Sequence, residues 1–298
     1  MAGAGKIRFP PSLMPPTRDT PDPSWNLNSG DLWRDMAKIR VTAPLVHNIT
    51  NYVVMNLTAN ALLSAGASPV MAHAIEEVEE LAGLAQALVV NLGTLSSAWV
   101  EAMSLAARFA KRRGIPVVLD PVGCGATAFR TKTTRRLLDE TSPTVIRGNA
   151  SEIRAIYRDG ERTKGVDSQR GSDEALDAAL GISEQYRCVV SVSGEIDLVV
   201  SNGKVAKVRN GHPLMTKVTG MGCTASALTA AFCAVNPSAG EAAAHAMALM
   251  GIAGELAAEK CSGPGTFQPV FLDLLYSLDQ TQVSSRLRRG DAPEGHPA

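Results

Sequence analysis

The stretch Gly-Met-Gly-Cys, at positions 220–223, stands directly before a run of residues with the pattern of a helix over 223–235. The first N–H groups of a helix have no intrahelical acceptor, and the helix dipole favours negative charge there. Gly220 and Gly222 let the backbone approach an anion closely. The pattern predicts an anion site that suits phosphate. A tight turn without a ligand is the alternative, because an isolated Gly-x-Gly is common.

Cys223 adds a nucleophile or base to this turn. A cysteine at a helix N-terminus can have its pKa lowered from about 8.5, which would give a partly ionised thiolate. The alternative is a small buried side chain that only fills space. Its place at the predicted anion site favours a functional role.

Other catalytic signatures are absent from the sequence. It contains no G-x-S-x-G elbow, no G-x-x-x-x-G-K-[ST] phosphate loop, and neither the H-R-D nor the D-F-G signature of protein kinases. If the protein transfers a phosphoryl group, it must therefore bind the phosphates and the acceptor with motifs other than these.

The composition favours a small-molecule partner. Lys plus Arg equals Asp plus Glu, at 29 each, so no broad attraction to nucleic acid or to an anionic membrane is expected. The five cysteines are scattered without a C-x-x-C pair, which indicates reduced thiols in a cytoplasmic protein. No secretory segment is apparent, and His245 and Glu255 interrupt the longest apolar stretch, which argues against membrane spanning.

Short apolar runs alternate with segments long enough for a helix. This alternation predicts an α/β fold with a mainly parallel sheet and helices on both faces. Residues 97–113 form the clearest predicted helix, ending at Gly114. Asn202-Gly203 predicts a hairpin and hence a small antiparallel edge.

The ends of the chain differ from the rest. Prolines crowd residues 1–30, which are predicted to be a flexible extension, and residues 281–298 are predicted to be a loose tail. Residues 31–280 then form a single domain. In such a fold ligands bind beyond the carboxyl ends of the strands, which predicts a site at residues 47–51, 120–127, 147–152 and 191–195.

Seven stretches, taken in order, closely resemble the hydroxyethylthiazole kinases, thiamine-salvage enzymes of the ribokinase-like group. The resemblance runs from about Val41 to Leu278. The stretches are HNITNYVVMNLTANALLSAGASPVMAHAIEEV, LVVNLGTLS, PVVLDPVGCGATAFRT, IRGNASEI, KGVDS, NGHPLMTKVTGMGCTASA and GPGTFQ.

The resemblance implies a ribokinase-like fold and a reaction. The reaction is ATP-dependent phosphorylation of 4-methyl-5-(2-hydroxyethyl)thiazole, which gives the thiazole phosphate and ADP. It also implies Mg²⁺, and a homotrimer with active sites between neighbouring subunits.

By the same resemblance, Gly220, Met221, Gly222 and Cys223 form the anion hole that holds the phosphoryl group in transfer. Larger sugar kinases of this group usually carry Asp, the catalytic base, at the Cys223 position. Because phosphoryl transfer depends largely on positioning and charge stabilisation, Cys223 is assigned as catalytic without being assigned as the base.

Substrate contacts follow from the resemblance residue by residue. Arg147 and Ser193 match ATP-contacting positions. Met71 and Gly220 match thiazole-contacting positions, and a methionine wall suits a flat, polarizable ring. Ordinary structural roles are the alternatives.

His47 and Asn48, at a predicted strand end, are expected to shape the thiazole pocket, although His47 could equally be a structural histidine. Asp120 and Glu152 are the expected carboxylates of the magnesium region, because hard Mg²⁺ prefers oxygen ligands. Glu152 could instead be a first-turn charge that stabilises a helix dipole.

Two departures from the family pattern bear on the site. Met221 stands where Ala is common, so its side chain must point away from the phosphate, and Ser193 stands where Thr is common. Rival predictions are a kinase for another vitamin precursor (hydroxymethylpyrimidine or pyridoxal), a lyase that repairs hydrated nicotinamide nucleotides, and a catalytically silent thiazole- or nucleotide-binding protein.

Overall fold

The short apolar runs of the sequence form the eight strands of one sheet. The computed structural model describes residues 27–158 and 171–290. The sheet order is β2-β1-β3-β4-β5-β6-β7-β8; neighbouring strands are parallel as far as β6, and β7 and β8 are antiparallel. The strands are β1 (Leu45–Ile49), β2 (Ser68–Val70), β3 (Ala87–Asn91), β4 (Val117–Asp120), β5 (Val145–Asn149), β6 (Val189–Ser193), β7 (Asp197–Ser201) and β8 (Lys204–Val208).

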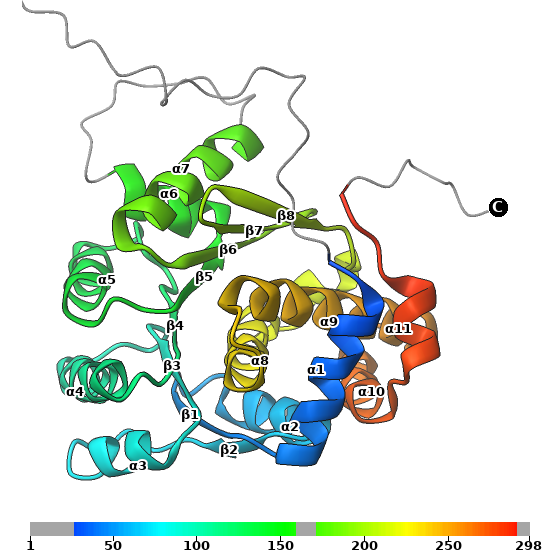
Figure 1. The fold of residues 1–298 in the computed structure, drawn as a ribbon, viewed down its shortest axis with the longest axis horizontal. Coiled ribbons are helices and arrows are strands. Elements are labelled where there is room, and N and C mark those ends of the chain that lie inside the picture. Colours follow the sequence, from blue (N-terminus) through cyan, green and yellow to red (C-terminus); the bar gives the residue numbers. More distant parts are fainter. Residues whose placement is uncertain (1–26, 159–170, 291–298) are drawn as a thin grey trace, which may run out of the picture.

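Helices cover both faces of this sheet, as the alternating pattern predicts (Figure 1). On one face lie α3 (Val78–Leu84), α4 (Ser97–Arg113), α5 (Ala128–Thr141), α6 (Ala150–Arg158) and α7 (Gly171–Tyr186). On the other lie α1 (Ser29–Thr42), α2 (Met55–Ala65), α8 (Met221–Val235), α9 (Ala239–Lys260), α10 (Pro264–Ser277) and α11 (Gln280–Arg286), with the 3-10 helix η2 (Pro213–Lys217) before α8.

The two faces of the sheet bury separate apolar clusters, because successive strand residues point to opposite sides. Val89 belongs to the cluster beneath α8, whereas Leu88 and Val90 belong to the cluster beneath α4. The same alternation directs Asn91 and Asp120, the last residues of β3 and β4, toward α8. The fold thus brings polar strand ends under the first turn of that helix.

Local signals in the sequence account for several element boundaries. Helix α4 ends at Gly114, which has a left-handed φ of 67°. Helix α9 begins after Ser238, whose side chain accepts from the Glu241 N–H. Asn202 and Gly203, with φ of 50° and 73°, join β7 to β8. The predicted hairpin, helix and parallel sheet are confirmed.

The predicted domain begins at residue 31, whereas its first helix begins two residues earlier. Helix α1 begins at Ser29, where the Asn28 side chain accepts from the Asp31 N–H, and Leu32 is fully buried. Residues 1–26 of the expected extension lie outside the described residues, as does the KGVDS motif at 164–168.

The predicted loose tail is wrong for its first ten residues. Asp279 and Gln282 form a capping box that starts α11, and Val283 is fully buried in the core. Val208 also forms a bridge with Arg289. Leu287 packs against the same core, and Arg288 hydrogen-bonds to Asn210 and Glu255, so apolar and polar contacts together anchor the segment. Residues 291–298 lie outside the described part.

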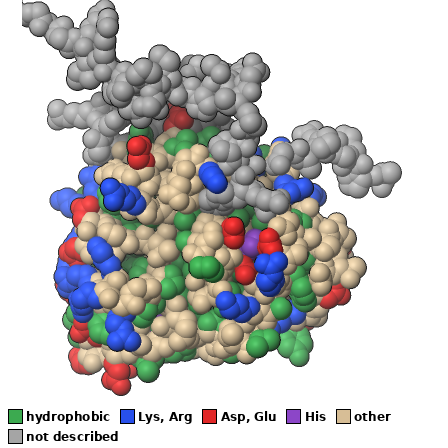
Figure 2. Space-filling model, viewed as in Figure 1, with side chains coloured by type: hydrophobic (Ala, Val, Ile, Leu, Met, Phe, Trp, Pro, Cys, Tyr) green, Lys and Arg blue, Asp and Glu red, His purple; other side chains and the backbone are tan. Residues whose placement is uncertain are grey.

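The surface agrees with a balanced net charge. On the face drawn in Figure 2, blue and red side chains are interspersed over the outer helices. Within the described ranges, no helix is both long and apolar enough to span a bilayer.

Candidate active site

The Gly-Met-Gly-Cys stretch forms the first turn of α8. Gly220 is the N-cap with φ of 87°, and a Cβ at this position would lie 2.9 Å from Val54 Cγ1. The helix begins at Met221, two residues earlier than predicted. The first backbone bond of this helix runs from Thr224 N–H to Gly220 O, so the three preceding amides lack an intrahelical acceptor.

Arg147, from β5, lies against this helix start. A Cβ at Gly222 would lie 2.8 Å from Arg147 Nη1, so only glycine permits this approach. The Arg147 side chain is buried, and its Nε has no hydrogen-bond partner among the described residues. A buried cation beside amides that lack an intrahelical acceptor gives this helix start a positive local charge that suits an anion.

A cavity of about 690 Å³ opens beside this helix start, and its volume is within the range of small-molecule pockets. Ser193, at the end of β6, lines it together with Arg147 and residues 220–222. Met215, Met247 and Met250 line the cavity as well. The two residues predicted to contact ATP therefore share one pocket with the predicted anion hole.

Met221 lines the cavity and also belongs to the buried core. Its exposure is 6%. Most of its side chain is therefore taken up by packing within the protein.

Cys223 lies at the same helix start and contacts Asn51, whose Nδ2 donates to Sγ at 3.6 Å. Burial, and then the negative charge of Asp120, raise the pKa of the thiol to about 12. The predicted lowering of this pKa is wrong, because desolvation of the thiolate outweighs the favourable helix terminus. Cys223 is a neutral thiol at neutral pH.

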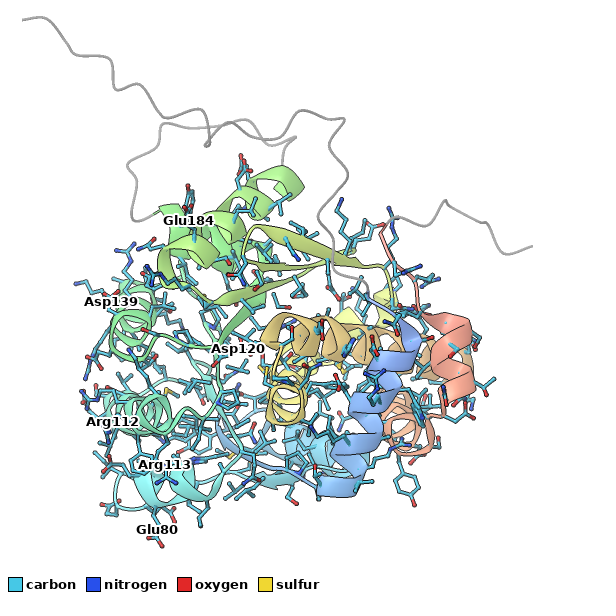
Figure 3. The ribbon with its side chains drawn as sticks, in the orientation of Figure 1. Glu80, Arg112, Arg113, Asp120, Asp139 and Glu184 are labelled. Carbon is cyan, nitrogen blue, oxygen red and sulfur yellow. The ribbon has the colours of Figure 1, made fainter. Side chains whose placement is uncertain are left out.

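Asp120 ends β4 and is 1% exposed. Its Oδ2 accepts from Asn91 Nδ2 at 2.7 Å and from Ser226 Oγ at 2.8 Å. Burial raises the pKa of this carboxyl to about 6 despite the positive charge of Arg147. Figure 3 shows Asp120 in the interior, between the sheet and the helices around α8, whereas the labelled Arg112, Asp139 and Glu184 lie on the outer helices.

Glu152 joins two of the predicted loops. Its Oε1 accepts from Gly123 N–H at 2.9 Å and its Oε2 from Asn149 N–H at 2.8 Å, while Asn149 Oδ1 accepts from Glu152 N–H at 3.0 Å. Its charge also raises the pKa of Asp120. The first-turn capping role is thus present in the structure.

His47 and Asn48 lie on β1, next to the strand β2 that precedes Met71. They cannot both face α8, because successive residues of a strand point to opposite sides of the sheet. The His47 Nε2–H donates to Ala72 O at 2.8 Å, next to Met71. Burial lowers the pKa of His47. His47 therefore holds the loop that carries Met71, while Asn48 shares the α8 side with Val46 of the core cluster.

Sheet order sets out the predicted site residues in one row. Met71 follows β2 and His47 lies on β1; Asp120 follows on β4, Arg147 on β5 and Ser193 on β6. The sequence prediction assigns no individual role to three residues that hydrogen-bond within this site: Asn51, which lies in the predicted range 47–51, Asn91 at the end of β3, and Ser226 on α8. Of these residues, Asn91 is recognisable from the sequence, because it is a polar residue that ends the apolar run ALVV.

Comparison with known proteins identifies the family of the chain. A hydroxyethylthiazole kinase family model matches residues 36–281. The chain belongs to the hydroxyethylthiazole kinase family. The resemblance found in the sequence motifs is confirmed.

Relatives named hydroxyethylthiazole kinase match nearly their full length. One from Syntrophus aciditrophicus is 59% identical over 257 residues, covering 86% of this chain and 95% of the relative. One from Oleidesulfovibrio alaskensis is 54% identical over 254 residues, covering 85% and 96%. A solved hydroxyethylthiazole kinase structure from Pyrococcus horikoshii has a TM-score of 0.81 at 41% identity, covering 87% of this chain and 98% of that one.

A more distant structure shows the fold alone. The pyridoxal kinase of Staphylococcus aureus, in complex with AMP-PCP and pyridoxal, has a TM-score of 0.53 at 14% identity and covers 72% of this chain and 88% of that one. The predicted ribokinase-like α/β fold is confirmed, and membership of the hydroxyethylthiazole kinase family favours the thiazole alcohol over the rival vitamin precursors.

Proposed function

We propose that this chain transfers the γ-phosphoryl group of ATP to the hydroxyl of 4-methyl-5-(2-hydroxyethyl)thiazole. The O–P bond to ADP breaks, an O–P bond to the alcohol oxygen forms, and the hydroxyl proton is released. The observation that carries the proposal is the Arg147 guanidinium packed against Gly222 at the open start of α8, beside Cys223.

The row of strand ends supports a division of the site. ATP binds in the 690 Å³ cavity with Arg147 and Ser193 against its phosphates. The thiazole binds near Met71, His47, Asn48 and Gly220, and the two substrates meet at Cys223. Amides at the start of α8 and the Arg147 guanidinium stabilise negative charge as it develops on the transferred group.

Cys223 acts in this proposal as a neutral thiol that positions the alcohol. A thiol with a pKa of about 12 is a poor proton acceptor at neutral pH. Because the transition state of phosphoryl transfer is often loose, early removal of the alcohol proton is a minor requirement.

Asp120 and Glu152 fit a magnesium site. Within the described residues, no group of three or more His, Cys, Asp or Glu side chains gathers to hold a metal, and Mg²⁺ often binds through one or two carboxylates with waters and substrate phosphates. The hydrogen bonds from Asn91 and Ser226 to Asp120 both use Oδ2, whereas each Glu152 oxygen accepts a backbone N–H. Asp120 would hold the ion, with Glu152 accepting from one of its waters. The ion would neutralise charge on the β- and γ-phosphates.

Assembly and location are part of the same proposal. The family resemblance supports a homotrimer whose subunits complete each other's thiazole site, and free cysteines support a cytoplasmic location. Mass measurement in solution tests the assembly, and a stable, active monomer would contradict it.

Phosphorus NMR of the protein with ATP, Mg²⁺ and the thiazole alcohol tests the function, with a hydroxymethylpyrimidine alcohol as control. The expected result is a phosphate monoester that forms only with the thiazole. Folded protein that binds ATP yet forms no thiazole phosphate would overturn the proposal in favour of another acceptor or a silent binding protein.

A further inference from the structure

Asn91 joins the two halves of the site through both ends of its carboxamide. It is fully buried at the end of β3, and the parallel register pairs it with Asp120 on β4. Its Nδ2 donates to Asp120 Oδ2 at 2.7 Å. Its Oδ1 accepts from Asn51 Nδ2 at 2.8 Å and from Gly93 N–H at 3.0 Å.

Asn51 carries the connection on to the thiol. It is 4% exposed, and its Nδ2 also reaches Cys223 Sγ at 3.6 Å. It packs directly on the turn after β3, where a Cβ at Gly93 would lie 2.5 Å from Asn51 Nδ2. A continuous set of contacts therefore runs from Cys223 through Asn51 and Asn91 to Asp120.

The chemistry of this set fixes the orientation of Asn91. A carboxylate accepts hydrogen bonds, so the NH₂ group of Asn91 must face Asp120. Its oxygen must then face the two N–H donors. Aspartate at this position would lose the donor and place a second negative charge beside Asp120, and an apolar residue would lose all three hydrogen bonds.

We propose that Asn91 is a positioning residue that holds the metal-side carboxylate and the acceptor-side thiol in one fixed geometry. The inference rests on the proposed kinase function for its catalytic readout. It assigns to Asn91 no contact with substrate: Asn91 acts through Asp120 on one side, and on the other through Asn51 and its own hydrogen bond to Cys223.

Asn91→Leu tests this role, with Asn236→Ala as the matched control. Asn236 also donates from Nδ2 to an aspartate, Asp35 Oδ2 at 2.7 Å, but it does so at the far end of α8. Asn91→Leu is expected to lower kcat about ten- to hundred-fold, the usual effect of losing a hydrogen bond to a charged group, with little change in KM for the thiazole. Asn236→Ala is expected to change only thermal stability.

A binding measurement gives a readout that does not need turnover. Calorimetric titration of ATP over a range of Mg²⁺ concentrations, without thiazole, is expected to show that Asn91→Leu needs about tenfold more Mg²⁺ for half-maximal binding than wild type. If wild type binds Mg-ATP but forms no thiazole phosphate, the proposed function fails while this comparison still decides the role of Asn91.

Gly93→Ala covers the case in which Asn91→Leu does not fold. It leaves Asn91 intact and displaces the Asn51 side chain, so it is expected to lower kcat while leaving the Mg²⁺ requirement unchanged. The proposal is overturned if Asn91→Leu matches Asn236→Ala in both kcat and Mg²⁺ requirement. Unchanged kcat in a folded Gly93→Ala variant would overturn the acceptor-side half.

Discussion

Replacing Gly222 with alanine should impair catalysis without weakening the fold. The added Cβ would lie 2.8 Å from Arg147 Nη1, whereas ordinary contacts begin near 3.4 Å, so the guanidinium must retreat by roughly half an ångström. Displacements of about 1 Å in a catalytic group can cost about a hundred-fold in rate, so kcat/KM should fall about ten- to hundred-fold. Bulkier residues should lose still more.

The free energy of unfolding of Gly222→Ala should rise while its activity falls, since alanine favours a helix over glycine by up to about 1 kcal/mol. Gly30→Ala is the matched control: Gly30 is also the second residue of its helix, α1, and its added Cβ would meet nothing closer than 3.4 Å. Steady-state kinetics by ADP release and thermal unfolding should be measured on both variants. Wild-type kcat/KM in folded Gly222→Ala would refute the placement of Arg147 as an anion-site residue.

Three further predictions concern the charge and the acceptor side of the site. Cys223→Ala should lose about tenfold in kcat, less than the 10²–10⁴ attributed to a general base, and Cys223→Asp should stay active; steady-state kinetics will show whether the alanine loss reaches the base range. Burial raises the pKa of Asp120 from 3.8 to about 6, so the stability of wild type falls as pH rises from about 4 to about 6 and is level above that range. Asp120→Asn should therefore be more stable than wild type by up to about 3 kcal/mol at pH 8, with the gain vanishing below pH 4. Urea unfolding at pH 5 and pH 8 tests that sign, and an equal difference at both values would contradict it. His47→Ala should release the loop at Ala72 and raise KM for the thiazole about tenfold with a smaller change in kcat, and an unchanged KM would remove His47 from the pocket.

The strand ends can be predicted from the sequence because they depend on local pattern. Apolar runs interrupted by glycine and polar residues predict buried parallel strands, and a parallel sheet places all their carboxyl ends at one edge. The pattern therefore assigns Asp120, Arg147 and Ser193 to the same edge of the sheet. The first turn of α8 follows from local pattern in the same way, with an error of two residues at its start.

Contacts between distant segments do not follow from local pattern. The link from Asn51 through Asn91 to Asp120 depends on β3 lying between β1 and β4, an order that chain sequence alone does not fix. The burial of Val283 depends on how α11 packs on α1, although the capping box at Asp279 signals a helix. A polar residue that ends a strand, such as Asn91, shows its importance only when its partners on other strands are known.

The pKa of Cys223 shows why position in a helix does not settle a residue's chemistry. A helix terminus contributes at most a few kcal/mol and only where its amides face the charge, whereas burial can shift a pKa by several units. At Cys223 the carboxylate of Asp120 adds to burial, so both larger effects oppose ionisation. The same helix start still favours the anion that enters it, because a transferring phosphoryl group brings its own charge and is met by Arg147. The turn is therefore suited to hold a charge that arrives with the substrate, and poorly suited to generate one on the thiol.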